Sequence, residues 1–385
     1  MHVSSFLMSC GAVFVVSASV VPATAQLRVD QTNLVSDIPG LAKLTDPDLV
    51  NAWGISFGPT SPFWISDNGA GLATLYSVPG SGPPSVSKVG LTVTLPPTAG
   101  GITSAPTGQV FNGGVGFGGA VFLFDSEDGV ISGWSGGTSA VRHEDFGPAA
   151  VYKGLAISDP GTNDAVLYAT NFRAGTIEAY DPSFAAPVSV TGNFTDPNLP
   201  TGYAPFNDKV INGQLYVTYA LQDATKHDDL AGAGHGFVDV FNLDGTLDKR
   251  LISMGALDSP WGLQIAPASF GSFADDLLVG NFGNGMINAY NPTTGAFVGT
   301  LDGSDGSPLV IDGLWGLTVG NGSAAGGSLD TLFFTAGPNG ESDGLFGSLA
   351  VPEPSTWAML GLGFIGLGWL GLRRSRWPQA ARPAL

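Results

Sequence analysis

One short pattern recurs along the chain at nearly constant spacing. In its clearest copies it is tryptophan followed by glycine, and in the others a different residue takes the place of tryptophan. The recurring positions are Trp53, Thr107, Lys153, Phe206, Trp261 and Trp315, which are separated by 54, 46, 53, 55 and 54 residues. Glycine follows five of them, and Asn207 follows Phe206. A repeat of this length indicates a fold built from similar supersecondary units, each of which stacks on its neighbours.

Each unit contains the same succession of short apolar segments. In the first unit we predict strands at residues 54–57, 63–66 and 73–77, with a turn rich in Asn, Asp and Gly at residues 67–69. These residue types tolerate the positive φ that tight hairpins require. Fourth strands are predicted at residues 188–194, 247–252 and 297–301. The units therefore read as small antiparallel sheets.

Repeated four-stranded sheets of this length predict an all-β, six-bladed β-propeller. The last unit lacks a fourth strand, and residues 27–35 alternate like a strand ahead of the first unit. We expect this N-terminal strand to complete the last blade and close the ring, which protects the sheet edges. A β-helix has a much shorter period, and a string of sandwiches would not repeat the pattern at constant spacing.

The composition excludes several other classes of protein. Gly 57 and Pro 27 interrupt helices too often for a long helical fold. The apolar share of 43% is ample for a core, which excludes disorder. Lys+Arg 14 against Asp+Glu 32 gives a net charge of −18, so binding to nucleic-acid phosphates is not expected.

The N-terminal segment has the character of an export signal. An apolar run ends in small residues that include Ala23 and Ala25, and a polar stretch begins at Gln26. We interpret residues 1–25 as a signal peptide removed by signal peptidase. Because Cys10 is the single cysteine, the mature chain would have no disulfide and no thiolate site.

The C-terminal segment combines a short motif, an apolar run and an arginine cluster. Val351, Pro352, Glu353 and Pro354 precede the run at residues 356–372. The cluster consists of Arg373, Arg374 and Arg376. A helix of that length is about 25 Å long, just enough to cross a bilayer core with some thinning. The arginines would remain cytoplasmic and place the upstream chain outside.

This tail resembles the PEP-CTERM sorting signal of Gram-negative bacteria, also known as the ice-binding-protein C-terminal domain, a label that implies no ice binding here. The resemblance implies recognition by an exosortase, removal near residues 352–354 and an association with exopolysaccharide production. Residues 31–37 and 51–54 also resemble an uncharacterised family of exported bacterial six-bladed propellers, with no known activity. The expected organisation is a signal peptide (1–25), a propeller (26–351) and a sorting signal (352–385).

Polar residues gather in the loops that precede the inner strands and in those joining second to third strands, which share one rim of a propeller channel. The candidate ligand-binding residues are Asn51, Asn68, Lys153, Asn171, Arg173, Asn207, Asp208, His227, Asp228 and Asn281. The side-chain oxygen atoms of the Asn and Asp residues among them could hold a hard cation or hydrogen-bond a sugar. Tight hairpins need the same residue types, and this interpretation is favoured for most of them.

The loop at residues 222–235 is much longer than its equivalents and carries His227 and three acids. It is either a metal site or lid over the channel, or a solvated acidic flap. The recurring tryptophans, in contrast, are expected to pack between blades rather than to stack on a ligand.

Two functions remain open. The first is an exported binding or scaffold propeller at the cell surface or in the extracellular matrix, with a polysaccharide as the expected partner. The second is a propeller hydrolase or lactonase that depends on a divalent cation such as Ca²⁺ on the channel axis. The sequence contains no recognised catalytic constellation, which favours the first hypothesis.

Overall fold

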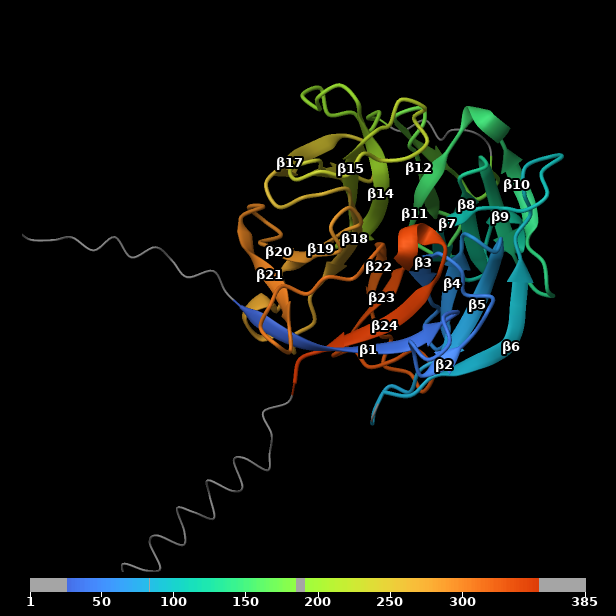
Figure 1. Cartoon of the computed structure of the whole chain (residues 1–385). Helices are drawn as coiled ribbons and strands as arrows, with labels where there is room; N and C mark the ends of the chain where they lie inside the picture. Colours follow the sequence, from blue (N-terminus) through green and yellow to red (C-terminus); the bar gives the residue numbers. More distant parts are fainter. Residues whose placement is uncertain (1–25, 83, 185–190, 353–385) are drawn as a thin grey trace, which may run out of the picture.

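The computed structural model describes residues 26–82, 84–184 and 191–352, whose regular secondary structure is almost entirely β-strand in mainly antiparallel sheets (Figure 1). Apart from β1 and β2, the strands of each group below pair in sequence order. The first three sheets contain β3 (Ala52–Ser56), β4 (Phe63–Asp67), β5 (Leu72–Ser77) and β6 (Ser87–Thr94); β7 (Pro106–Phe111), β8 (Phe122–Ser126), β9 (Val130–Trp134) and β10 (Val141–Asp145); and β11 (Tyr152–Ser158), β12 (Val166–Asn171) and β13 (Thr176–Tyr180). The following groups are β14 (Tyr203–Ile211), β15 (Gln214–Leu221), β16 (Phe237–Asn242) and β17 (Leu247–Ser253); β18 (Pro260–Ile265), β19 (Leu277–Asn281), β20 (Ile287–Tyr290) and β21 (Phe297–Gly303); and β22 (Leu314–Val319), β23 (Leu332–Ala336) and β24 (Leu345–Ala350).

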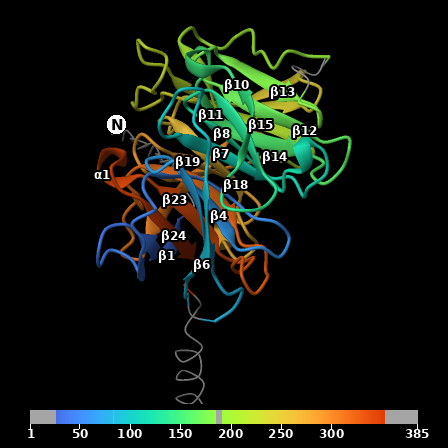
Figure 2. The same cartoon turned by 90° about the vertical axis from the view of Figure 1, so that its right-hand side faces the viewer.

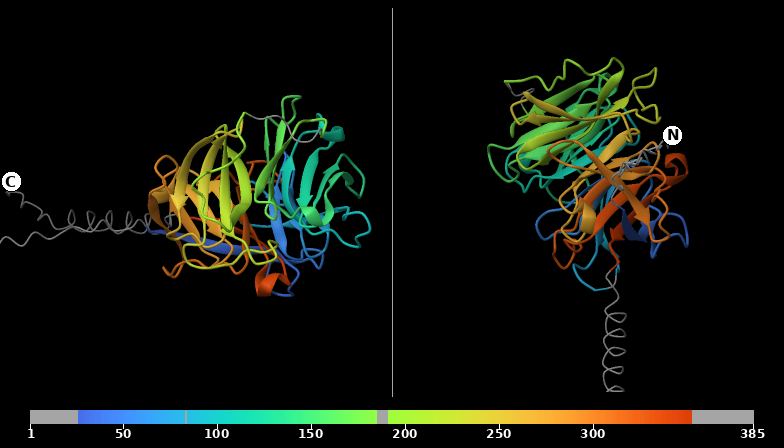
Figure 3. Two further views of the ribbon diagram at one scale, coloured as in Figure 1. Left: turned by 90° about the horizontal axis from the view of Figure 1, so that it is seen from above. Right: turned by 90° about the vertical axis from the view of Figure 1, so that its left-hand side faces the viewer.

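The sheets are arranged in a ring around a central channel. The inner strands β3, β7, β11, β14, β18 and β22 contact one another in that order, and β22 contacts β3. Figure 1 shows these strands around the middle of the ring, with β6, β10, β17 and β21 farther out, and Figure 2 and Figure 3 show the sheets from the sides and from above. The fold is therefore all-β and propeller-like, as the repeat predicts.

The N-terminal strand closes the ring. In β1 (Leu27–Ser36), Asp30 lies opposite Ala350 of β24 in an antiparallel pair, which confirms the pairing predicted for residues 27–35. The same strand also pairs in parallel with β21, where Leu27 lies opposite Leu301. This second pairing was not predicted, and it joins the last two groups of strands into one continuous sheet that also includes β2 (Leu44–Thr45).

The strand predicted at residues 188–194 is not formed in its described part, residues 191–194. The N–H groups of Gly192 and Phe194 donate instead to the carbonyl oxygens of Asp244 and Gly245, in the turn between β16 and β17. Backbone groups that bond to a neighbouring sheet cannot also pair with β13. Among the described residues, the sheet of β11 to β13 therefore has three strands.

The repeated glycine allows the inner strands to approach closely. A Cβ atom on Gly54 would lie 2.3 Å from the carbonyl oxygen of Thr107, and one on Gly108 would lie 2.4 Å from the backbone nitrogen of Leu155. Real Cβ atoms do not approach so near, so a larger residue would push the inner strands apart. The glycine of the repeat thus sets the diameter of the channel.

The apolar cores lie between neighbouring sheets. At the closure, Phe63 of the first sheet packs against Phe333 and Phe346 of the last, with ring centroids 4.6 and 5.4 Å apart. Buried aromatic pairs of this kind add stability beyond the area that they bury.

The predicted signal peptide and the apolar run at residues 356–372 lie outside the described residues. Among the described residues, no helix is both long and apolar enough to span a bilayer.

Candidate functional site

The three tryptophans of the repeat meet on the channel axis. The rings of Trp53 and Trp315 stack with centroids 3.6 Å apart, and Trp261 meets them edge-on at 6.2 and 5.9 Å. Together with neighbouring aromatic side chains they form an aromatic layer, which consists of Trp53, Phe172, Phe206, Trp261, Phe282 and Trp315. The contacts of Trp315 with Trp53 and with Trp261 lie between neighbouring inner strands, as expected, and the contact of Trp53 with Trp261 reaches past one strand toward the axis.

The indole N–H groups of the aromatic layer are all bonded. Trp53 and Trp315 donate to the same side-chain oxygen of Asn51, at 2.9 and 3.2 Å, and Trp261 donates to the backbone carbonyl of Lys153 at 2.9 Å. A buried indole without an acceptor would destabilise the fold. Asn51 and Lys153 therefore orient the aromatic layer as well as lining its surface.

Lys153 stands where three other units have tryptophan, and its side chain is only 3% exposed. The ammonium group lies 5.0 Å from the centroid of the Trp53 ring and is paired with the Glu127 carboxylate. It is also 3.5 Å from Asp228. Burial alone would lower the pKa of Lys153, but attraction to Glu127 and Asp228 outweighs burial, so the pKa is raised.

A polar network surrounds this ion pair at the N-terminal ends of the inner strands. Asn68 donates to Glu127 at 2.9 Å and accepts from Asn51 at 3.2 Å. Asn51 also donates to Glu341, at 2.9 Å, in the short helix α1 (Pro338–Glu341). We call this group the rim cluster, which comprises Asn51, Asn68, Glu127, Lys153, His227, Asp228 and Glu341.

The acids of the rim cluster differ in protonation. Burial raises the pKa of Glu341 to about 7, and the negative charge of Glu127 adds to the shift. The hydrogen bond from His227, at 2.7 Å, holds the pKa of Asp228 at about 2. The same bond raises the pKa of His227. The cluster thus contains a carboxyl group that titrates near neutral pH beside one that stays ionised.

The raised pKa of Glu341 predicts that stability depends on pH. An unfolded Glu has a pKa of about 4.3, so the folded state holds this proton more tightly. Its stabilising effect is complete below about pH 4 and is lost as the pH rises through 7. We expect the free energy of unfolding, measured by urea titration, to fall by about 1 kcal/mol or more between pH 5 and pH 8. Burial also raises the pKa of Asp125 to about 7, and this acts in the same direction.

The control for this prediction compares two neutralised acids. Glu341→Gln should flatten part of the pH dependence, whereas Asp330→Asn, on an exposed loop elsewhere, should leave it unchanged. Equal slopes for Glu341→Gln and the unmodified protein would contradict the assignment.

Three side chains of the rim cluster could hold a metal ion by distance alone. Glu127, His227 and Asp228 each offer one ligand atom, and these atoms lie within 4.8 Å of one another. However, the Lys153 ammonium is paired with the same two carboxylates. A divalent cation there would be repelled by Lys153 unless that side chain moved. The arrangement fits an ammonium group better than a metal.

The rim cluster unites five of the residues singled out in the sequence, namely Asn51, Asn68, Lys153, His227 and Asp228. Others stand apart and hold turns. Asn171 donates to Glu178 at 2.8 Å, Arg173 donates to the carbonyl of Pro148 at 2.7 Å, and Asn281 donates to the carbonyl of Ala256 at 2.8 Å. Asn207 donates to the Trp261 carbonyl at 2.7 Å.

Two residues of the rim cluster, Glu127 and Glu341, were not among the candidates. Each lies in the loop between the second and third strands of its unit, at positions equivalent to the turn that carries Asn68. The sequence does predict these loops, residues 125–128 and 339–343, at one rim of the ring, but it does not single out the two acids within them.

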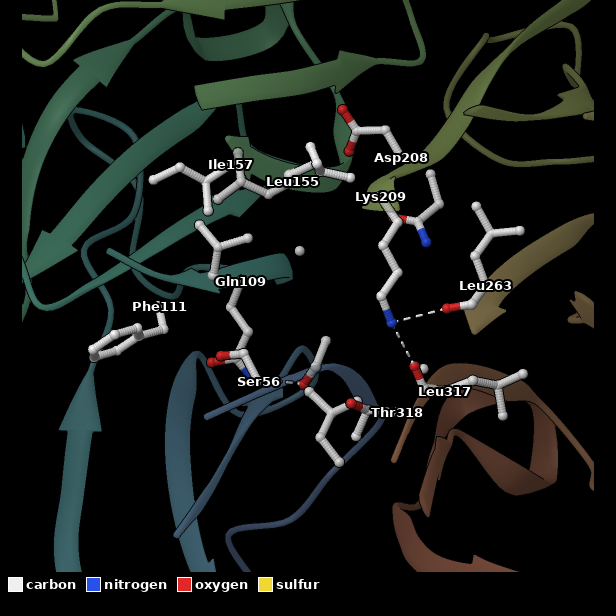
Figure 4. Close-up of a pocket in the computed structure, with 18 of the residues that line it drawn as sticks. Ser56, Gln109, Phe111, Leu155, Ile157, Asp208, Lys209, Leu263, Leu317 and Thr318 are labelled. Carbon is white, nitrogen blue, oxygen red and sulfur yellow. Dashed lines mark hydrogen bonds between the residues drawn. The ribbon is translucent and has the colours of Figure 1, made fainter. Parts of the chain in front are cut away.

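A cavity of about 310 Å³ occupies the channel on the other side of the aromatic layer, toward the C-terminal ends of the inner strands. Figure 4 shows Gln109, Leu155, Asp208 and Lys209 around it. Asp208 was expected on the rim, but it belongs to this wall. Among the described residues, neither of its carboxylate oxygens has a hydrogen-bond partner. Burial, reinforced by the charge of Asp125, raises its pKa well above the ordinary value.

Comparisons with known proteins agree with this architecture. The chain is 33% identical over 332 residues to one uncharacterized protein of Acanthamoeba polyphaga mimivirus, covering 82% of this chain and 78% of the relative. A second uncharacterized protein of that virus is 31% identical over 335 residues, covering 82% and 84%. The protein therefore belongs to the same family as these viral proteins.

Two solved structures illustrate the likeness of fold. The α-L-arabinanase of Penicillium chrysogenum has a TM-score of 0.50 at 10% identity, covering 86% of this chain and 99% of its own. The WD40 β-propeller domain of Doa1 has a TM-score of 0.45 at 10% identity, covering 84% and 98%. At such low identity these matches concern the fold alone.

The PEP-CTERM protein-sorting motif matches residues 350–374. This motif implies exosortase-mediated sorting and export across the membrane to the cell surface. The C-terminal resemblance identified in the sequence is thereby confirmed.

Proposed function

We propose that the protein is an exported six-bladed propeller that acts as a binding or scaffold module at the cell surface or in the extracellular matrix. The proposed organisation is a signal peptide at residues 1–25, a propeller at residues 26–351 and a sorting segment at residues 352–385. In the precursor, the run at residues 356–372 would serve as the membrane helix. The six groups of strands and the closing strand β1 support the blade count.

The rim cluster is the observation that carries this proposal. Asp228 is 67% exposed and His227 is 38% exposed, and both stand above a closely packed aromatic floor. Exposed carboxylate and imidazole groups can bind the hydroxyl groups of a sugar. Because the net charge is −18, an anionic polymer would be repelled. The proposed partner is therefore an uncharged exopolysaccharide or another matrix component.

Binding can be tested by calorimetry with neutral polysaccharides chosen from a glycan array. We expect Asp228→Asn and His227→Ala each to weaken binding about tenfold, as expected for the loss of a hydrogen bond to a charged group. Asp248→Asn is the matched control, because it removes an exposed acid from the strand β17. No binding to any neutral polysaccharide, or equal losses in all three variants, would contradict the proposal.

The second candidate is a metal-dependent hydrolase or lactonase, and the grouping of Glu127, His227 and Asp228 is the observation that favours it. Elemental analysis of the purified propeller distinguishes the two functions. One equivalent of a divalent cation, lost in Asp228→Asn, would support the enzyme. Metal-free protein that binds polysaccharide would support the binding module.

Mass spectrometry of the mature C-terminus would test removal of the sorting segment near residues 352–354.

A further inference from the structure

The mature N-terminus stands directly before the closing strand β1. Under the proposed organisation the signal peptide ends at Ala25, so the mature chain begins with Gln26. In the structure Gln26 lies just ahead of β1 and is exposed. Among the described residues, its side-chain amide has no hydrogen-bond partner. The side chain of the first mature residue is therefore available for chemistry.

The chain is anchored one residue later. Leu27 lies opposite Leu301 in the parallel pairing with β21, and its side chain is 7% exposed in the core of the last two groups of strands. Val29 lies opposite Gly303 and is 1% exposed. A free residue that precedes a fixed strand keeps the N-terminus at the surface in a defined place.

We propose that Gln26 is a modification site of the mature protein, at which the α-amino group and the side-chain amide close into a pyroglutamate ring. The proposal rests on the cleavage after Ala25 that the proposed function includes. The glutamine side chain has the right length, because the ring that forms has five atoms. An asparagine in the same place would have to form a strained four-membered ring.

The reaction balances without a further reactant. The α-amino nitrogen attacks the side-chain carbonyl carbon, Cδ, and forms a new C–N bond. The bond between Cδ and Nε2 breaks, and Nε2 leaves as ammonia with one proton taken from the attacking amine. All ring atoms belong to Gln26, so the ladder that begins at Leu27 is not disturbed.

The attacking amine is present in its reactive form near neutral pH. An exposed α-amino group has an ordinary pKa of about 7.7–8.0, so roughly one in ten is unprotonated at pH 7. No unusual environment is required, in contrast to a buried lysine. The exposure of Gln26 also lets the departing ammonia enter solvent directly.

The modification would protect the strand that closes the ring. An aminopeptidase needs a free α-amino group, and a pyroglutamate has none. Chain ends open locally at a smaller free-energy cost than the rest of a fold, so β1 is the part of the ring most open to trimming. Loss of Leu27 would remove both a pairing with β21 and a buried side chain. The ring at Gln26 therefore preserves the closure.

The test is mass spectrometry of the full protein after export and purification. The first lysine after Gln26 is Lys43, so a lysine-specific protease releases residues 26–43 as one peptide. We expect this peptide to be lighter by one ammonia, about 17 Da, than the peptide with a free N-terminal glutamine. A synthetic peptide of residues 26–43 taken through the same digestion should remain mostly unconverted. Equal conversion of the two would overturn the proposal, because the ring would then form during preparation.

Gln26→Asn is the matched variant, since it keeps the amide and shortens the side chain by one carbon. Its peptide should retain the free α-amine. In urea at a concentration that loosens β1, a broad-specificity aminopeptidase should remove residues from Gln26→Asn and none from the unmodified protein. A mature chain that begins at Gln26 with a free amine would overturn the proposal and leave the cleavage intact. A chain that begins elsewhere would overturn the proposed cleavage and the site with it.

Discussion

Replacing Trp315 by alanine is expected to lower the free energy of unfolding by about 4 kcal/mol, the range for a large buried aromatic side chain. The ring is 1% exposed and stacks between Trp53, at 3.6 Å, and Phe282, at 4.0 Å. Its removal would leave a cavity on the axis, where inner strands from all sides of the ring converge. Chemical denaturation followed by circular dichroism measures the change.

Trp315→Phe is the conservative partner of that variant. It keeps an aromatic ring in the stack and loses the hydrogen bond to Asn51, so a loss of about 1–2 kcal/mol is expected. If Trp315→Ala and Trp315→Phe destabilise the protein equally, aromatic stacking on the channel axis does not stabilise the ring of sheets.

Replacing Glu127 by glutamine is expected to lower the free energy of unfolding by about 3 kcal/mol, because the Lys153 ammonium would remain buried with little compensation. The matched control is Asp48→Asn, which breaks the more exposed pair between Asp48 and Lys88, and should cost less than about 1 kcal/mol. Thermal and urea unfolding of both variants measure the difference.

The double variant Glu127→Gln with Lys153→Met provides the decisive comparison. Methionine can pack on Trp53 without a charge, so the double variant should recover to within about 1 kcal/mol of the unmodified protein. The pH dependence gives a further check. Because the pKa of Lys153 is raised, its stabilisation is full below about pH 10.4 and is lost as the pH rises through the folded value. A double variant as unstable as Glu127→Gln alone would contradict a role for the buried charge.

The repeat was enough to predict the sheets and the role of β1, because both follow from local alternation and constant spacing. The repeat did not predict that the tryptophans contact one another. Equivalent positions in a ring lie at the same distance from the axis, but the sequence does not show how small that distance is. Lys153 at one of these positions was the signal that the axis carries charge. The register of β1 against β21 depends on contacts between distant segments, which local pattern does not encode.

The candidate site was predicted less completely for a related reason. The sequence cannot distinguish an Asn that binds a ligand from an Asn that bonds to nearby backbone. In the structure, Asn171 accepts from the backbone N–H of Ala174 and Asn281 donates to the carbonyl of Ala256. Only the three-dimensional paths of the loops bring Glu127 and Glu341 beside Asn68 and Asn51. Asp208 follows Asn207 directly, yet the two side chains serve different neighbours because successive residues of a strand face opposite ways.

The position of β1 between β21 and β24 has a consequence for biogenesis. The first segment to emerge during translocation cannot find its partners until residues 297–303 and 345–350 have followed it across the membrane. Such late, long-range pairing is slow, and until it occurs the unpaired edges invite association with other chains. A chaperone that shields residues 27–36 until then would therefore increase the yield of folded protein.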